Sequence, residues 1–304
     1  MDLFEKFETV EIKAEGRLSE ADREYCERQE AAYHAAVKFH VELLRAWTLL
    51  NRSQRDILGD SSADDNKKYL LNSNLLKIDD DLIRNHISRL HTRFIGAITG
   101  YFRRTYAVDI EDYAMRNELP PQKPDWSYDP KEQDAYFPAA AAVIRYADIL
   151  EDIFKQLDGR SFTEQAEYQM RRKCREAVWK GNVLPTYERR KATIRFTDNF
   201  CDYQVTGCGY HTETSWNLSD KMKKVIRGIA HFETGSCTDC PREMQYLLGD
   251  KFYPDERTFT DCRTVAYLKL FKNGRVDIKF TSVLLAEEFA EKYLGRTSLQ
   301  EEAA

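Results

Sequence analysis

The chain has little of what would assign it to a membrane or to an export route. Its 304 residues contain no apolar run of the ~18 residues that a membrane-spanning helix needs. Its first residues lack the basic-then-apolar pattern of a signal peptide. We therefore expect a protein that stays in the cytoplasm in which it is made and that has no membrane partner.

The local motifs of common enzymes are also missing. The sequence has no Gly-rich phosphate-binding loop, no nucleophile elbow and no H-E-x-x-H pair. Gly207-Cys208-Gly209 is too short for a dinucleotide-binding fingerprint. By elimination we expect a protein that works by binding and is not an enzyme, with no catalytic residues, no cofactor and no resident metal.

The net charge is only −5, too mild for a mimic of DNA and weak evidence against a general nucleic-acid binder. The charge is uneven, however, because residues 160–195 carry ten Lys or Arg against four Glu. The clustered cations are Arg171, Arg172, Lys173, Arg175, Arg189, Arg190 and Lys191. This basic segment is either a solvated helix face or a surface for an anionic partner, protein or nucleic acid.

Seven cysteines in a chain without an export signal argue against a disulfide framework. Cys237 and Cys240 have the spacing with which two thiolates bind one zinc ion. A closed zinc site would need further ligands, and the available ones are Cys201, Cys208, Cys262, His211 and His231. A redox C-x-x-C would follow a strand, whereas a Gly-Ser turn precedes this one. Cys237 and Cys240 are therefore zinc ligands, redox thiols or ordinary cysteines, and the sequence leaves all three interpretations open.

The strongest secondary-structure signal is a hairpin over residues 264–280. Two alternating runs flank Asn273-Gly274, which predicts a type I′ turn with both residues left-handed. Residues 276, 278 and 280 share the apolar face of the second strand, and a helix over 282–294 should cover it. In that helix we expect Val283, Leu284, Phe289, Tyr293 and Leu294 to make the cover. An isolated hairpin is marginal in water, so upstream strands must extend it.

The polar face of the second strand carries Asp277 and Lys279. This acidic-x-Lys pair is typical of half of a metal-dependent nuclease site, for which Asp261 is a possible second carboxylate. Ordinary alternation on a half-exposed strand explains the same residues without chemistry.

Helical spacing predicts long helices over 19–50 and 79–106, and further helices over 139–158, 162–180 and 220–231. Strands are expected over 191–196 and 202–205. The apolar stripes include or adjoin His34, His40 and His86, which we interpret as structural, whereas His91 falls on another face of its helix. The Pro-rich segment 120–138 is the best candidate boundary. We predict an α+β chain with a helical part over 1–119, a Pro-bounded helical insertion over 120–190 and an α+β unit over 191–304.

The turn Phe271-Lys272-Asn273-Gly274, the helix over 218–232 and the closing helix from 284 resemble an uncharacterised domain carried by phages, prophages and plasmids. That family often has a His in the strand after the turn, where this chain has Asp277. Residues 79–106 and 191–206 also resemble its earlier elements, whereas 107–190 do not.

With its size and its lack of a catalytic signature, the chain is similar to the Gabija anti-defence proteins of phages. The resemblance implies a homo-oligomer in the host cytoplasm that binds the Gabija nuclease–helicase complex and keeps it from binding and cleaving DNA. It assigns no functional residues. Segments 120–138 and 160–195 are the candidate surfaces. The alternatives are a nucleic-acid-binding anti-restriction protein and the metal-dependent nuclease.

Overall fold

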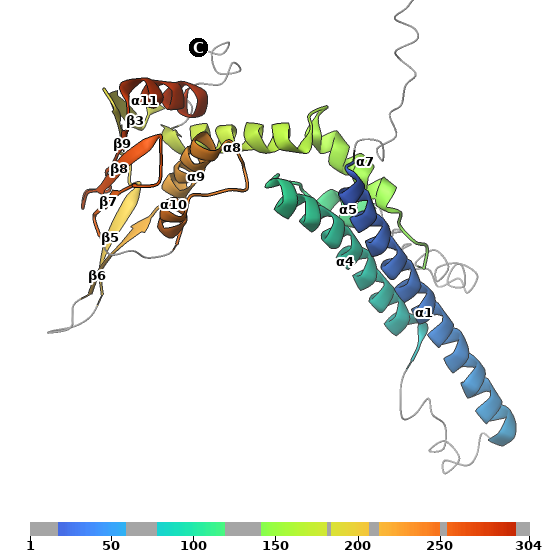
Figure 1. Ribbon diagram of the computed structural model, residues 1–304. Helices are drawn as coiled ribbons and strands as arrows, with labels where there is room; N and C mark the ends of the chain where they lie inside the picture. The colour runs from blue at the N-terminus through green and yellow to red at the C-terminus, as the bar shows by residue number, and fades with distance from the viewer. Residues whose placement is uncertain are drawn as a thin grey trace, which may run out of the picture. The chain divides into compact units, whose positions relative to one another are not determined.

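The computed structural model describes residues 18–58, 78–118, 141–180, 184–206, 213–249 and 254–295 (Figure 1). The chain forms two compact units. Unit 1 comprises residues 1–104 and 110–159, and unit 2 comprises 105–109 and 160–304. The Pro-rich segment 120–138, the loop 59–68, Gly181, Cys208 and His211 lie outside the described residues.

Unit 1 is helical and contains α1 (Glu20–Leu58), α4 (Asp80–Tyr106), α5 (Tyr113–Glu118) and α7 (Tyr146–Leu157). The helix predicted over 19–50 therefore continues for two more turns, and the one predicted over 79–106 is confirmed. α1 and α4 run antiparallel side by side (Figure 1). Their seam stacks Tyr25 on Tyr101 at 4.0 Å between ring centroids and Tyr33 on Phe94 at 4.4 Å.

α7 begins later than the predicted helix over 139–158, because residues 142–145 are not helical. Four successive alanines favour a helix locally. The backbone of Ile144 is instead bound by side chains of α1. Its N–H donates to the Tyr33 hydroxyl at 3.1 Å, and its carbonyl lies 3.3 Å from His34 Nε2. Tertiary hydrogen bonds therefore override the local preference at this point.

Unit 2 is built on a five-stranded antiparallel sheet in the order β3-β4-β9-β8-β7. The strands are β3 (Tyr187–Arg190), β4 (Thr193–Phe196), β7 (Glu256–Thr258), β8 (Val265–Leu270) and β9 (Val276–Phe280). The predicted hairpin is β8–β9. β4 pairs with β9 and β7 pairs with β8, which supplies the further strands that an isolated hairpin needs. β5 (Cys201–Thr206) and β6 (Glu213–Leu218) form a separate two-stranded ribbon.

The helices of unit 2 are α8 (Phe162–Val178), α9 (Asp220–Thr234), α10 (Arg242–Leu247) and α11 (Val283–Phe289), which continues as a π-helical turn over Ala290–Leu294. α8 is shorter than predicted because Trp179–Lys180 is strand β1, paired with β2 (Leu184–Pro185). One core joins these helices to the sheet, and it contains Val178, Ile194, Ile229, Ile278 and Phe289 among others.

Two details of the hairpin region differ from the prediction. Of the loop residues only Gly274 has a positive φ, of +80°, so the turn is not type I′. Its N–H donates to the Phe271 carbonyl at 2.9 Å, the pattern of a longer loop closed by a left-handed Gly. In the closing helix Val283 and Leu284 are exposed and do not cover the sheet, whereas Phe289, Tyr293 and Leu294 are buried.

The fold class is thus α+β, as predicted, with N-terminal helices and a small C-terminal antiparallel sheet. The two units divide the predicted insertion 120–190 at residue 159, because α8 packs on α9 and on the π-helical turn of unit 2. Within the described ranges, no helix combines the length and the apolarity to cross a membrane.

Candidate functional site

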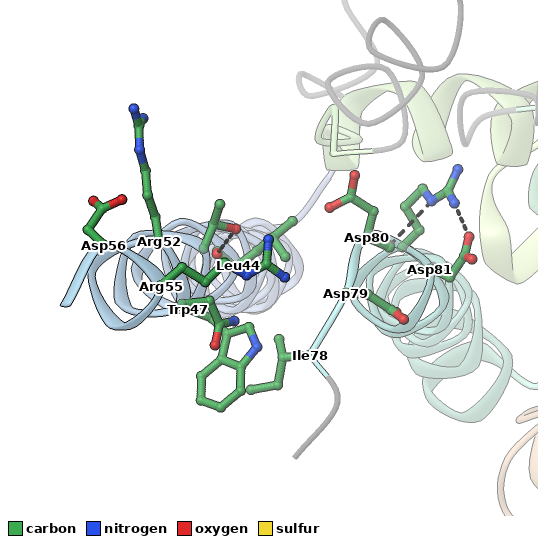
Figure 2. Close-up of a pocket in the computed structure, with 12 residues that line it drawn as sticks. Leu44, Trp47, Arg52, Arg55, Asp56, Ile78, Asp79, Asp80 and Asp81 are labelled. Carbon is green, nitrogen blue, oxygen red and sulfur yellow. Dashed lines mark hydrogen bonds and ion pairs between the residues drawn. The ribbon is translucent and has the colours of Figure 1, made fainter. Parts of the chain in front are cut away.

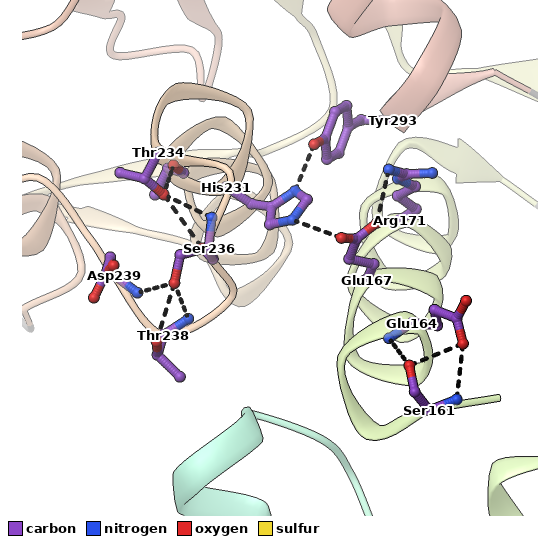
Figure 3. A network of polar contacts seen from close by, with 11 residues as sticks. Ser161, Glu164, Glu167, Arg171, His231, Thr234, Ser236, Thr238, Asp239 and Tyr293 are labelled. Carbon is purple, nitrogen blue, oxygen red and sulfur yellow. Dashed lines mark hydrogen bonds and ion pairs between the residues drawn. The ribbon is translucent and has the colours of Figure 1, made fainter.

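The basic segment of the sequence lies mainly on α8, which begins with a capping box. Ser161 Oγ accepts the Glu164 N–H at 3.2 Å, and the Glu164 carboxylate accepts the Ser161 N–H at 2.8 Å (Figure 3). On the helix Arg171 pairs with Glu167 at 3.1 Å and Arg172 with Glu176 at 3.4 Å. These carboxylates recur at helical spacing, so they neutralise the basic face within one helix.

The remaining cations of this segment bind groups that are remote in sequence. Lys173 pairs with Asp109, which lies in the short stretch 105–109 of unit 2. Arg175 donates to the carbonyl of Lys292 at 3.1 Å. Arg189 pairs with Glu287 at 3.0 Å. The basic segment therefore fastens α8 and β3 to their neighbours within unit 2.

Behind this face lies a buried polar network of α8, α9 and the π-helical turn (Figure 3). The His231 ring on α9 contacts two groups, one at each nitrogen. Its Nδ1 is 2.6 Å from the Tyr293 hydroxyl, and its Nε2 is 3.9 Å from Glu167 Oε1. Arg171 holds the other oxygen of the same carboxylate. π-Helical turns are rare and often occur at functional sites, which makes this network the strongest site-like arrangement of unit 2.

The protonation of the network follows from its burial. Burial lowers the pKa of His231, although Glu167 acts in the opposite direction, and it raises the pKa of Tyr293 to about 12. At neutral pH the imidazole is therefore neutral and the phenol keeps its proton. If the Tyr293 hydroxyl donates to Nδ1, then the ring proton is on Nε2 and faces Glu167. The hydrogen bond between His231 and Tyr293 joins α9 to the closing helix. Neither side chain is exposed, so neither presents a reacting group to solvent.

Close packing surrounds the same network. Cys174 on α8 is buried, and its thiol donates to the Lys224 carbonyl at 3.3 Å. A Cβ atom on Gly228 of α9 would overlap its sulfur. Burial raises the pKa of Cys174 to about 12, so this thiol is not a nucleophile at neutral pH.

The C-x-x-C pair lies in the loop after α9. Ser236 Oγ organises this loop by accepting the N–H groups of Thr238 and Asp239 (Figure 3). Burial raises the pKa of both Cys237 and Cys240, which disfavours the thiolate that zinc binding or redox exchange requires. In the part of the chain that the structure describes, no three His, Cys, Asp or Glu side chains are grouped so that they could hold a metal ion.

The acidic residue of the acidic-x-Lys pair on β9 makes ion pairs with neighbouring arginines. Asp277 lies opposite Arg195 of β4 and pairs with it at 3.3 Å, and also with Arg275 at 3.2 Å. Lys279 and Asp261 are exposed. Asp277 thus connects the hairpin to β4, and among the described residues it belongs to no group of three His, Cys, Asp or Glu side chains that could hold a metal ion.

The histidines of unit 1 lie on the helical seam. His91 is buried, with Nδ1 at 2.6 Å from the Tyr33 hydroxyl. His34 contacts the Ile144 carbonyl, and the rings of His40 and His86 are 5.5 Å apart. Two of these positions differ from the prediction: His91, expected on another face of α4, is buried in the seam, and His86, expected on the apolar face, is exposed.

Unit 1 also has an open pocket of about 670 Å³ between the last turns of α1 and the start of α4 (Figure 2). Arg52 and Arg55 approach it from α1, and residues 79–81 from α4. Asp79 Oδ1 accepts the Leu82 N–H at 2.9 Å, and Asp81 pairs with Arg84. These acids stabilise the N-terminus of α4, as their place in the sequence predicts. The charges of the pocket are mixed and select no ligand class.

No family model matches the chain, and no curated protein or solved structure matches it either. The sequence does not predict the buried network as a unit. It offers His231 only as a possible zinc ligand, and Glu167, Arg171 and Tyr293 carry no local motif that joins them to it. Their association depends on how α8, α9 and the closing helix pack.

Proposed function

We propose that this chain is a phage-encoded inhibitor of a host antiviral defence complex of the Gabija type. It acts in the host cytoplasm as a homo-oligomer that binds the nuclease–helicase complex and occludes its binding and cleavage of DNA. It is not an enzyme and needs no cofactor. Two resemblances motivate this choice. The hairpin and the neighbouring helices resemble an uncharacterised domain carried by phages, and the size of the chain and its lack of a catalytic signature are similar to those of the Gabija anti-defence proteins.

One structural observation supports a binding role above all. Three ionisable side chains of the described residues that could serve chemistry make contacts that hold unit 2 together. Asp277 is paired with two arginines, Arg171 with Glu167, and His231 with the Tyr293 hydroxyl. Groups used in this way contribute to the shape of a surface, and inhibition by occlusion requires a stable shape of sufficient area.

The proposal is tested with a purified Gabija complex and the tagged chain. We expect co-purification, loss of DNA cleavage by the complex and restored plating of a sensitive phage on cells that express the chain. A complex that neither co-purifies with the chain nor loses activity would overturn the proposal. A host strain without the defence genes is the control, since the chain should not change phage growth there.

A nucleic-acid-binding anti-restriction role is the second candidate. It is favoured by the exposed Arg190 and Lys191 at the end of β3, an edge strand of the sheet. Phosphate binding through these cations would fall steeply with salt. Substituting Arg190 and Lys191 by Gln should then weaken binding to duplex DNA in a salt titration. Equal DNA binding by the variant and the parent would exclude this surface.

A further inference from the structure

The five-stranded sheet of unit 2 has two chemically different faces. One face packs on the core, where Ile194 of β4, Ile278 of β9 and Leu268 of β8 form a buried row across neighbouring strands. Successive side chains of a strand point to opposite faces, so the residues that flank this row lie on the other side, which we call the outer face. The side chains of the outer face are half-buried or exposed. The outer face is therefore accessible to a partner.

Two rows of side chains cross the outer face, and the first row is neutralised by its own ion pairs. It alternates in charge from β3 to β7 and consists of Glu188, Arg195, Asp277, Lys269 and Glu256. Arg195 pairs with Asp277 at 3.3 Å. Lys269 pairs with Glu256. Opposite charges on directly opposed residues stabilise a sheet, so the fold alone explains this row.

The second row of the outer face has a different chemistry. It consists of Arg190, Thr193, Lys279, Tyr267 and Thr258, in the order of the strands from β3 to β7. None of the five is acidic, and each side chain ends in a hydrogen-bond donor. Arg190 pairs with Glu188 of the first row at 2.9 Å, but both side chains are exposed and such a pair contributes little stability. Lys279 is exposed and makes no ion pair within the described ranges. Pairing across the sheet therefore does not explain the second row as it explains the first.

The outer face as a whole has an excess of positive charge. Arg275 belongs to it as well, because its guanidinium pairs with Asp277 at 3.2 Å. The face then carries five cations, of which Lys279 is the most central, against the three carboxylates of Glu188, Asp277 and Glu256. The difference is +2, whereas the whole chain has a net charge of −5. A positive surface on a negative chain directs an anionic partner to that surface.

Aromatic side chains accompany these cations. Tyr267 lies between Lys279 and Thr258 in the second row, and its hydroxyl is hydrogen-bonded to Glu256. Phe271 follows at the end of the same strand, with the Arg275 guanidinium carbon 3.5 Å from its ring centroid. Aromatic rings and guanidinium planes are the groups on which unpaired nucleobases stack. The outer face thus combines phosphate-binding donors with stacking surfaces.

This combination fits one class of partner. Adjacent strands are about 4.8 Å apart, so the second row extends over roughly 19 Å and matches an extended polyanion better than a single anion. A duplex keeps the faces of its bases inside the stack and has none to place on Tyr267. An acidic peptide in an extended conformation would add to an edge of the sheet through its backbone and would leave this face unused. We propose that the outer face binds single-stranded nucleic acid, with phosphates along the second row and a base stacked on Tyr267.

This inference goes beyond the proposed inhibitor function and requires no host complex. It also differs from the binding of duplex DNA by the edge residues Arg190 and Lys191. The variants that test it change Tyr267 and Lys279 and leave the edge residues in place. A failure of one proposal is therefore distinguishable from a failure of the others.

The first experiment measures fluorescence anisotropy of labelled single strands of about 15 nucleotides, one of DNA and one of RNA, with the full chain. Tyr267→Leu should weaken binding at least about fivefold, because base stacking is lost. Lys279→Gln should reduce the slope of log K against log salt by about 0.7, the amount expected for one phosphate contact on a single strand.

Two matched variants on the helical side of unit 2 serve as controls. Tyr246→Leu changes an exposed tyrosine of α10, and Lys221→Gln changes an exposed lysine of α9. Both should leave the affinity and the salt slope unchanged. Thermal unfolding shows whether each of the four variants keeps the stability of the parent.

Four results would overturn the proposal. The first is a parent chain that binds neither single strand at low salt. The second is a DNA duplex of the same sequence that binds as tightly as the single strands. The third is parent-like binding by both Tyr267→Leu and Lys279→Gln. The fourth is an oligoglutamate of equal charge that competes as well as the unlabelled strand, because the face would then recognise charge alone.

The second experiment uses the unaltered chain and does not depend on the folding of a variant. A single strand with 5-iodouracil in place of one thymine is irradiated in the complex, and mass spectrometry identifies the attached peptide. We expect the crosslink at Tyr267 or at Phe271. Crosslinks confined to unit 1 or to the helices of unit 2 would overturn the placement of the strand on the outer face.

Discussion

At the scale of single residues, unit 2 is organised by close contacts that have no sequence motif. Gly228 allows α9 to approach α8 at the position of Cys174, and His231 and Tyr293 meet one turn further along α9. These contacts explain why a polar histidine and the Cys174 thiol are compatible with a packed core. Each contact can be tested by a substitution that changes the volume of a side chain or removes a titrating group.

Gly228→Ala should lower the free energy of unfolding by about 1–3 kcal/mol, since the added Cβ overlaps the Cys174 sulfur and forces the two helices apart. The cost should shrink in a Cys174→Ala background, which makes room for the methyl group. Urea unfolding of the four proteins measures this coupling. Gly96→Ala in α4 is the control, because its Cβ would meet only Arg116 Nη2 at 3.5 Å and helix propensity favours Ala there. Equal effects at both glycines would contradict the contact.

The depressed pKa of His231 makes stability depend on pH. The unfolded chain protonates this His near pH 6.5, and the folded chain only at lower pH, because burial disfavours the cation. Between these values the unfolded state binds more protons, so stability falls as the pH falls through this range. His231→Asn does not titrate and can still accept the Tyr293 hydrogen bond.

We therefore expect the stability difference between parent and His231→Asn to narrow as the pH is lowered from about 8 to about 5. Chemical denaturation at each pH measures it. Tyr293→Phe is the control, because it removes the hydroxyl but keeps the titrating ring. Parallel pH profiles of the parent and His231→Asn would contradict the shift.

At the scale of elements, the β8–β9 hairpin connects the parts of unit 2. Its strands pair with β4 and β7, and its turn binds the start of the β5–β6 ribbon. The Gly274 carbonyl accepts the N–H groups of Phe200 at 2.8 Å and Cys201 at 3.3 Å. The turn is thus a tertiary contact as well as a chain reversal, which explains why it takes a longer form than the type I′ turn.

Gly274→Ala should destabilise unit 2 more than Gly235→Ala does. Both glycines have positive φ, which costs any L-residue roughly 1–2 kcal/mol. A Cβ on Gly274 would also lie 2.8 Å from Asn199 Oδ1 and 3.0 Å from Asn199 Cα, whereas nothing lies within 4 Å at Gly235. Thermal unfolding measures the loss of stability in each variant, and the difference between the two losses is the contribution of the contact between the turn and Asn199. Equal losses would show that the ribbon moves away at little cost.

At the scale of the whole molecule, the chain has two units with separate interiors. The core of unit 2 runs from Cys174 to Leu294 and includes no residue of unit 1. The stretch 105–109 reaches α8 through Asp109, whose backbone N–H donates to Gln169 Oε1 at 2.6 Å and whose carbonyl accepts from Gln169 Nε2 at 2.9 Å. Among the described residues, this earlier stretch of the chain is therefore attached to unit 2 through α8.

Residues 160–304 produced alone should fold and unfold in one cooperative transition, because the core is complete in this fragment. Amide exchange in the first turns of α8 should be faster than in the full chain, since the Asp109 contacts are lost. Circular dichroism and hydrogen exchange measure the two effects. Gln169→Ala in the full chain is the matched control and should reproduce only the second one. A fragment without a cooperative transition would contradict an independent unit.

Most elements follow from local pattern. The acidic start of α4, the alternation of β8 and β9, and the capping residues of α8 and α9 are visible in the sequence, so the α+β class could be predicted. The strand β3 and the late start of α7 could not. The backbone at Ile144 is held by Tyr33 and His34, more than a hundred residues earlier, and no local window contains that information.

What the sequence determined by itself is therefore the periodicity, and with it where most helices and strands form. Only the tertiary structure decided what each polar side chain does. The arginines of α8 and β3, Asp277 and His231 could all have served a partner, a phosphate or a metal. Their roles depend on groups brought near from distant positions, because the energy of a charge or of a buried ring depends on its neighbours in space.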